Sequence, residues 1–150
     1  MIRYLSVTAL VAVGATIAYA QAVGGAAAIK QRQDAMKAVG AANKSLTAMV
    51  KGEAPFDAGK AAAGFKTMED NWAKAKVSFP DDSKTGADTA ALPAIWEKKA
   101  DFMAKFDKAI ADAKAAAADS KDEASFKAQH KTVVGNCGGC HKEYRQPPKQ

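Results

Sequence analysis

The chain has 150 residues and a formal net charge of +6, with 22 Lys and Arg against 16 Asp and Glu. It shows no internal repeat, so a single domain is the default for this length. The lysines are scattered through helical patterns and form no basic run interleaved with aromatic residues, so nucleic acid is not an expected partner. A modestly basic surface instead favours acidic partner proteins or anionic surfaces.

The first 20 residues differ in composition from the rest and predict a secretory signal peptide. Arg3 supplies a short basic region, residues 5–18 are mostly apolar, and an Ala-Tyr-Ala cleavage site ends at Ala20. The apolar run is short for a membrane span, and a retained N-terminal anchor is the alternative. Cleavage after about Ala20 would leave a mature domain of residues 21–150 in the periplasm, without stable membrane insertion.

The mature chain is rich in alanine and lysine, and its glycines and prolines fall mostly at breaks, as helices require. Apolar side chains at three-four spacing predict helices over about 26–51, 57–79, 93–118 and 120–146. Four amphipathic helices of this length predict an all-α fold, an antiparallel up-down-up-down four-helix bundle. The connection over 80–92 is long for such a bundle, so we expect it to cross one end.

Residues typical of helix ends mark the borders of these predicted helices. Gly52 is placed to terminate the first, and Asp57 is a suitable N-cap for the second. Pro93 is favoured at the first position of the third, and the run Ser120–Glu123 resembles a capping box for the fourth.

Each predicted helix has one inward-facing stripe. The stripes are Ile29, Arg32, Met36, Val39, Asn43, Leu46 and Val50; Ala61, Phe65, Met68, Trp72, Ala75 and Phe79; Trp96, Met103, Phe106, Ile110, Ala113 and Ala117; and Phe126, His130, Val133, Cys137, Cys140 and Tyr144. Arg32 and Asn43 are polar, which is unusual inside a purely structural bundle.

The last predicted helix contains Cys137-Gly138-Gly139-Cys140-His141, the attachment pattern of a c-type haem. The two thiols would add to the two vinyl groups of the porphyrin, and His141 would offer its imidazole to the iron. Positions three apart lie nearly above one another on a helix, so both cysteines can reach one ring. The glycines would let a planar group approach the backbone. The pattern predicts one covalently bound haem c.

Two cysteines and a histidine at this spacing could also serve without haem. A thioredoxin-like redox pair would follow a strand, and no strand-like alternation precedes Cys137. A zinc site would add His130 to Cys137, Cys140 and His141, but the two histidines are about 16 Å apart along a continuous helix, so the helix would have to break. A structural pair of buried thiols is the third possibility. We expect His130 to be a core or pocket-edge histidine.

Spacing alone does not identify the residue that would be the second axial ligand of the iron. In an up-down-up-down bundle the end of the last helix is level with the start of the first, which places Met36 near His141. Met49 lies about 20 Å further along the same helix and is therefore too far away to be the second ligand. The positions of Met68 and Met103 along the bundle axis do not exclude them. On spacing alone, a methionine that merely fills the core remains the ordinary interpretation of Met36.

Arg32 lies one turn before Met36 on the same face. It could pair with a haem propionate in a partly buried place, or it could extend its charged end to solvent at the bundle edge. The residue pattern leaves both roles open.

Taken together, the mature chain resembles the class II c-type cytochromes, the cytochrome c' family, over essentially all of residues 21–150. The segments that carry the resemblance are 137–145, 51–57, 93–96 and 32–36. Attachment of haem near the C-terminus of a four-helix bundle is specific to this class.

The resemblance implies a particular ligand set. High-spin members of the family have an apolar non-ligand, usually leucine, at one position, and low-spin members have methionine there. Counted back from the Lys51-Gly52 turn, this position is Met36, so the resemblance implies the low-spin branch with His141 as proximal and Met36 as distal ligand. Arg32 matches an arginine that lies next to the haem in many relatives. A homodimer formed through the first two helices is a further expectation.

The expected function is therefore periplasmic electron transfer, since His–Met ligation raises the reduction potential and leaves no open site on the iron. Arg32 and Arg145 would tune the potential through their charge, and the redox partners would carry acidic patches. The sequence shows no Ser-His-Asp arrangement and no Gly-rich phosphate loop, so an enzyme is not expected. The alternative is a five-coordinate cytochrome that binds CO or NO, with Met36 only lining the pocket.

Overall fold

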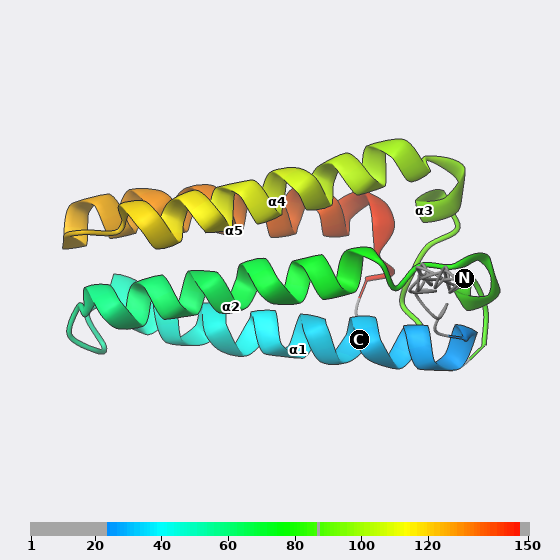
Figure 1. Cartoon of the computed structure of the whole chain (residues 1–150), viewed down its shortest axis with the longest axis horizontal. Coiled ribbons are helices and arrows are strands. Elements are labelled where there is room, and N and C mark those ends of the chain that lie inside the picture. The colour runs from blue at the N-terminus through cyan, green and yellow to red at the C-terminus, as the bar shows by residue number, and fades with distance from the viewer. Residues whose placement is uncertain (1–23, 87, 148–150) are drawn as a thin grey trace, which may run out of the picture.

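The computed structural model describes residues 24–86 and 88–147, so the predicted signal peptide lies outside the described residues. Four long helices pack as an antiparallel bundle (Figure 1): α1 (Gly25–Val50), α2 (Ala58–Lys76), α4 (Lys99–Asp119) and α5 (Glu123–Tyr144). Two short elements, η1 (Asp81–Ser83) and α3 (Ala94–Glu97), lie in the connection between α2 and α4. The predicted all-α four-helix bundle is confirmed. In the part of the chain described, no helix has the length and apolar character to cross a membrane.

The first two helix borders follow the expected chemistry. Gly52 adopts a φ of 76°, and its N–H donates to the carbonyl of Met49 (3.2 Å), which closes the end of α1. Asp57 caps α2, because its Oδ1 accepts a hydrogen bond from the Lys60 N–H at 2.9 Å. Both predicted caps are confirmed.

The predicted capping box of the last helix is two residues out of place. Asp122 is the N-cap: its Oδ1 accepts from the Ser125 N–H (2.8 Å), and the Asp122 N–H donates to Ser125 Oγ (3.1 Å). Ser120 instead belongs to the end of α4, where its Oγ donates to the carbonyl of Ala116 at 2.7 Å.

The second predicted helix ends three residues early, at Lys76. Two carbonyls just beyond this end accept hydrogen bonds from side chains of other helices. Arg32 Nη1 donates to the Ser78 carbonyl and Lys99 Nζ donates to the Phe79 carbonyl, both at 3.0 Å. These bonds attach the segment that follows α2 to α1 and α4.

The third predicted helix is broken at Lys98, whose φ of −113° and ψ of 42° separate α3 from α4. Pro93 precedes α3 instead of starting it. The break reorients α4, and its buried stripe is Phe102, Phe106, Ala109, Ala113 and Ala116. The predicted inward residues Met103, Ile110 and Ala117 are only half-buried, at the edge of this stripe.

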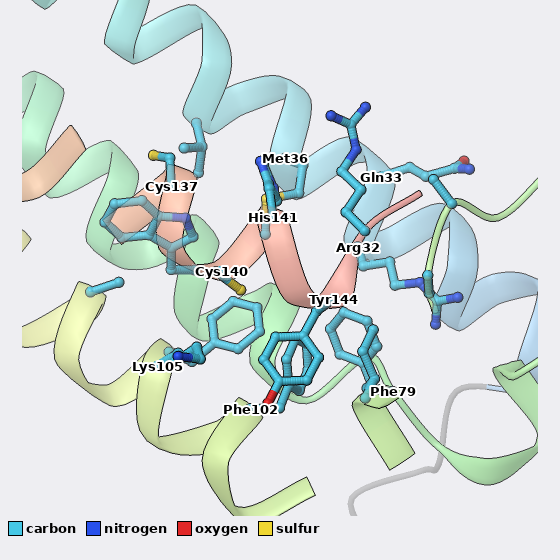
Figure 2. A pocket seen from close by; sticks show the side chains of 18 of the residues that line it. Arg32, Gln33, Met36, Phe79, Phe102, Lys105, Cys137, Cys140, His141 and Tyr144 are labelled. Carbon is cyan, nitrogen blue, oxygen red and sulfur yellow. The ribbon is translucent and has the colours of Figure 1, made fainter. Parts of the chain in front are cut away.

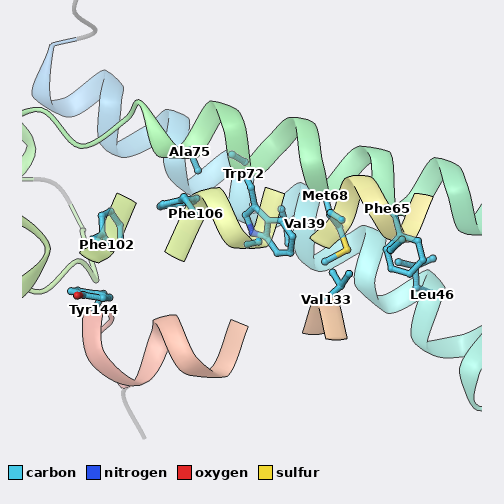
Figure 3. Packing of buried hydrophobic residues seen from close by; sticks show 14 of the residues in the cluster. Val39, Leu46, Phe65, Met68, Trp72, Ala75, Phe102, Phe106, Val133 and Tyr144 are labelled. Atoms are coloured by element: carbon cyan, nitrogen blue, oxygen red, sulfur yellow. The ribbon is translucent and has the colours of Figure 1, made fainter. Parts of the chain in front are cut away.

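The end of the bundle with the α1–α2 and α4–α5 turns is filled by its own side chains (Figure 3). Leu46, Phe65, Met68, Phe126 and Val133 are at most 1% exposed. The Phe65 and Phe126 rings lie 6.0 Å apart, in range of an edge contact. We call these five residues the closed core. At the end of α1 the buried residue is Met49, whereas the predicted Val50 is half-buried.

Three of the four long-helix neighbours pack closely: α1 on α2, α2 on α4, and α4 on α5. The helices α1 and α5 contact each other less extensively, along what we call the α1–α5 seam. His130 lies in this seam, 91% buried, with Nε2 3.1 Å from Asn43 Oδ1 and 3.3 Å from Thr47 Oγ1. Its predicted place in the core stripe of the last helix is confirmed.

Candidate cofactor site

A cavity of about 510 Å³ lies where α1 begins and α5 ends. All six residues singled out from the sequence line it. They are Arg32 and Met36 from α1, Cys137, Cys140 and His141 from α5, and Arg145, which follows α5. Figure 2 shows Arg32, Met36, Cys137, Cys140 and His141 around one space. The bundle thus brings together side chains that lie more than 100 positions apart in the chain.

Both cysteines are half-buried free thiols on one face of a continuous helix. Burial raises the pKa of the Cys137 thiol, and it raises the pKa of Cys140 to about 11 even though the Lys105 charge opposes the shift. Thiols of this kind carry little thiolate at neutral pH, unlike the low-pKa cysteines of disulfide oxidoreductases. The chemistry of this pair therefore does not suit a thioredoxin-like role.

The imidazole of His141 borders the same cavity. His141 is an exposed residue, yet partial desolvation of its ring and the nearby positive charge of Arg145 hold its pKa below its ordinary value. The neutral imidazole is the form that binds a metal.

A zinc site of Cys137, Cys140, His141 and His130 is not formed. Helix α5 is unbroken from Glu123 to Tyr144, and His130 is turned to Asn43 and Thr47 on α1. Over residues 24–86 and 88–147, no group of three or more His, Cys, Asp or Glu side chains is placed to hold a metal ion.

The glycines of the motif have a different setting from the one expected. Gly138 and Gly139 are exposed and do not line the cavity, and a Cβ added to either would meet nothing within 4 Å. They lie on the outer face of α5, so the structure gives no support for the idea that a planar group must approach the backbone between the two cysteines.

Of the methionines in the described chain, only Met36 lines the cavity. It is half-buried, and in Figure 2 its side chain and the His141 ring both point into the pocket. Met68 belongs to the closed core, and Met103 lies outside the cavity lining. Helix spacing left three methionines open, and of these Met36 alone lines the cavity in the described chain; ligation of the iron by Met36 stays a prediction.

Arg32 is 5% exposed, so the expectation that its charged end might extend to solvent is wrong. Its Nη1 donates to Ser83 Oγ (2.8 Å) and its Nη2 to the Ser83 carbonyl (3.0 Å) and Thr89 Oγ1 (2.7 Å), besides the bond to the Ser78 carbonyl. The guanidinium also lies over the Phe79 ring, 4.7 Å from its centroid. Arg32 thereby ties the 78–89 connection to α1 as one wall of the cavity. Contact with a propionate stays a prediction.

The end of α5 is tied to the same connection. Ala91 and Arg145 form an antiparallel bridge, with the Leu92 N–H donating to the Tyr144 carbonyl (3.1 Å) and the Gln146 N–H to the Ala90 carbonyl (2.8 Å). Sequence patterns did not reveal this bridge, because each partner is a short, irregular stretch.

Several further lining residues were not identified as site residues from the sequence. Some of them had been assigned to the inward stripes, and others come from the 88–91 connection or from positions outside those stripes, such as Lys105 and Asn136. Trp72 is the clearest case, because a core tryptophan and a cavity-wall tryptophan occupy the same stripe of α2.

The lining suits a flat, largely apolar group with a few charges at one edge. Two thiols three residues apart on α5 can anchor such a group, and His141 and Met36 offer an imidazole and a thioether from different helices. The basic side chains Arg32, Lys37 and Arg145 can meet carboxylates. A four-helix bundle with these donors around its cavity defines a protein that binds a c-type haem.

Comparison with known proteins assigns the family. Residues 27–145 match the family described as Cytochrome C', and the chain belongs to this family of haem proteins, whose members carry covalent haem c. It is 44% identical over 144 residues to cytochrome c' of Rhodopseudomonas palustris, covering 96% of both chains. It is 40% identical over 127 residues to cytochrome c-556 of Agrobacterium fabrum, covering 84% of this chain and 86% of that protein.

Solved structures agree with the fold. Cytochrome c' from Rhodopseudomonas palustris superposes with a TM-score of 0.78 at 46% identity, over 81% of this chain and 98% of that one. A nitric oxide complex of a mutant cytochrome c prime from Alcaligenes xylosoxidans has a TM-score of 0.73 at 28% identity, over 83% and 98%. The relatives include both cytochrome c' and cytochrome c-556, so family membership leaves the second axial ligand of this chain open.

Proposed function

We propose that this protein carries single electrons in the periplasm, with one haem c attached at Cys137 and Cys140 and ligated by His141 and Met36. The observation that carries the proposal is the position of Met36, the one methionine of the described chain on the cavity wall. Bound there, the haem would supply an iron that accepts and returns one electron. The export expected from residues 1–20 agrees with attachment of haem c after translocation.

The two proposed ligands belong to helices of one packed bundle. His141 lies on α5 and Met36 on α1, and both helices are joined to α2 and α4 by a continuous hydrophobic core. A ligand pair held in this way should move little between oxidation states. His–Met ligation would also raise the reduction potential and close the iron to added ligands.

The charges around the cavity favour an acidic redox partner. Lys37, Lys105 and Arg145 line it together with the buried Arg32, whereas Asp88 is the one acidic residue among the lining side chains. Positive charge near the iron would favour the ferrous state, and an exposed basic rim would attract an acidic surface.

A second candidate is binding of a small gas molecule by a five-coordinate iron. The names of the relatives support it better than they support electron transfer: cytochrome c' is 44% identical over nearly the whole chain, and a more distant relative has been solved with nitric oxide bound. In that case Met36 would line the distal side without binding the iron.

Absorption spectra of the purified, haem-loaded protein distinguish the two candidates. With Met36 as ligand, the ferric protein should show a weak far-red band and the ferrous protein should not bind CO rapidly at neutral pH. The Met36→Leu variant should lose the band, become high-spin and bind CO. Met49→Leu is the matched control, because Met49 is buried on the same helix away from the cavity and should leave both spectra unchanged. Rapid and complete CO binding by the unaltered protein would support the gas-binding candidate instead.

A further inference from the structure

Trp72 occupies an unusual position on α2. The residue is 5% exposed, it lines the cavity, and its indole Nε1–H donates no hydrogen bond to any residue in the described ranges. The only other tryptophan of the chain, Trp96, does have a partner, since its Nε1–H donates to the Pro80 carbonyl at 3.3 Å. Figure 3 shows the indole nitrogen of Trp72 turned away from Met68 and Val133, toward the open end of the bundle.

A buried indole N–H normally finds an acceptor, because leaving it unpaired forfeits its hydrogen bond to water. Every fully buried side-chain nitrogen and oxygen of the described chain has a partner. The small accessible surface that Trp72 retains therefore belongs to the cavity, and its acceptor is to be sought among the groups that meet there.

The register of the helices places Trp72 and Met36 at the same depth of the cavity. A Cβ added to Gly64 would lie 2.7 Å from Leu46 Cδ2, so residues 64 and 46 are level on the antiparallel pair α1 and α2. Eight residues further along α2 is Trp72, and eight residues back along α1 is Ala38, within one turn of Met36. The thioether of Met36 is thus a cavity acceptor at the same depth.

Two other kinds of acceptor are less well placed than the Met36 sulfur. Haem carboxylates should gather where the exposed Lys37 and Arg145 line the cavity, and not among apolar side chains. Around Trp72 the lining is apolar, with Val39, Phe106 and Ala109. The side-chain oxygen Oδ1 of Asn43 already lies 3.1 Å from His130 Nε2.

We infer that Trp72 is a positioning residue that donates a hydrogen bond from Nε1 to the Met36 sulfur in the haem-loaded protein. The inference rests on the proposed ligation of iron by Met36. A sulfur lone pair that is not bound to the iron can accept such a bond. The bond would orient the thioether and draw electron density away from the iron, which favours the ferrous state.

The direct test is a ¹H–¹⁵N spectrum of the ferrous, haem-loaded protein, in which only two indole N–H signals are present. The Trp72 signal should exchange slowly with solvent and should shift in Met36→Leu, while the Trp96 signal should change little. A Trp72 signal that exchanges rapidly and ignores the substitution would overturn the inference, and this measurement needs no variant of Trp72 itself.

The second test compares the reduction potentials of Trp72→Phe and Trp96→Phe. In Trp72→Phe the equilibrium constant for reduction should fall about two- to tenfold, the range that one net hydrogen bond supports, with the far-red ferric band retained. Trp96→Phe, which removes an N–H bonded to the backbone, is the control and should change the constant by less. An unaltered protein without the far-red band would overturn both the ligation and the inference. A protein with the band, but with no change in Trp72→Phe, would overturn the inference alone.

Discussion

The two ends of this bundle use the same four helices differently. In the closed core, Leu46, Phe65, Met68, Phe126 and Val133 fill the space between the helices. Toward the other end the same inward stripes continue, yet a cavity of about 510 Å³ separates α1 from α5. Protein interiors are normally packed without such voids. A regular three-four pattern therefore predicts where a bundle forms, and the volume of the side chains along that pattern decides where the bundle leaves room for a cofactor.

The largest expected loss of stability comes from a substitution in the closed core. Phe65→Ala should lower the free energy of unfolding by about 3–5 kcal/mol, because the fully buried ring leaves a void beside Phe126. Urea unfolding of the chain with Cys137→Ser and Cys140→Ser, which cannot attach haem covalently, measures it. In the same background Met36→Ala should cost clearly less, since Met36 is half-buried and borders the cavity. Absence of cooperative unfolding in this background would contradict an independently packed core.

Two glycine substitutions compare the packing of the closed core with that of the cavity end, with smaller expected changes in stability. Gly64→Ala should destabilise the bundle by about 1–3 kcal/mol, because its Cβ would lie 2.7 Å from Leu46 Cδ2 in the tightest part of the α1–α2 contact. Gly40→Ala should stabilise the cysteine-free chain by up to about 1 kcal/mol, since a Cβ there meets nothing within 4 Å and alanine favours the helix. Chemical denaturation of the two variants side by side gives the sign of each. Equal effects would argue against the packing difference.

The smallest effect concerns His130, which lies between the two ends in the α1–α5 seam. Burial lowers the pKa of His130, so below about pH 6.5 the unfolded chain takes up a proton more readily than the folded one. Stability should therefore fall as the pH drops below 6.5, with a slope of at most about 1.4 kcal/mol per pH unit from this residue. His141 contributes in the same direction, so the measurement is the difference between the parent chain and His130→Gln. Parallel pH profiles would show that His130 does not titrate in this way.

The sequence was most informative where function and periodicity coincide. Cys137, Cys140 and His141 are recognisable from local spacing alone, and the inward stripes of α1 and α5 place Arg32 and Met36 at the same cavity as the motif. The caps at Gly52 and Asp57 are equally local, since each depends on the chemistry of one turn.

The features that could not be predicted depend on contacts between distant segments. The break at Lys98 divides the third predicted helix, and no proline or glycine marks it. The helix α2 ends early, and the carbonyls of Ser78 and Phe79 beyond its end are bound by the side chains of Arg32 and Lys99 from other helices. Helix spacing left Met36, Met68 and Met103 open, and which of them lines the cavity depends on how all four helices pack together.

The connection between α2 and α4 is held at both ends: Arg32 bonds to Ser78, Ser83 and Thr89, and the bridge of Ala91 with Arg145 fixes its far side. Surface connections usually tolerate added or deleted residues. Here a change of length would displace a wall of the pocket, so engineered changes of length should be better tolerated at the 51–57 and 120–122 turns. Those two turns are also the rational places to insert a peptide tag or a second domain.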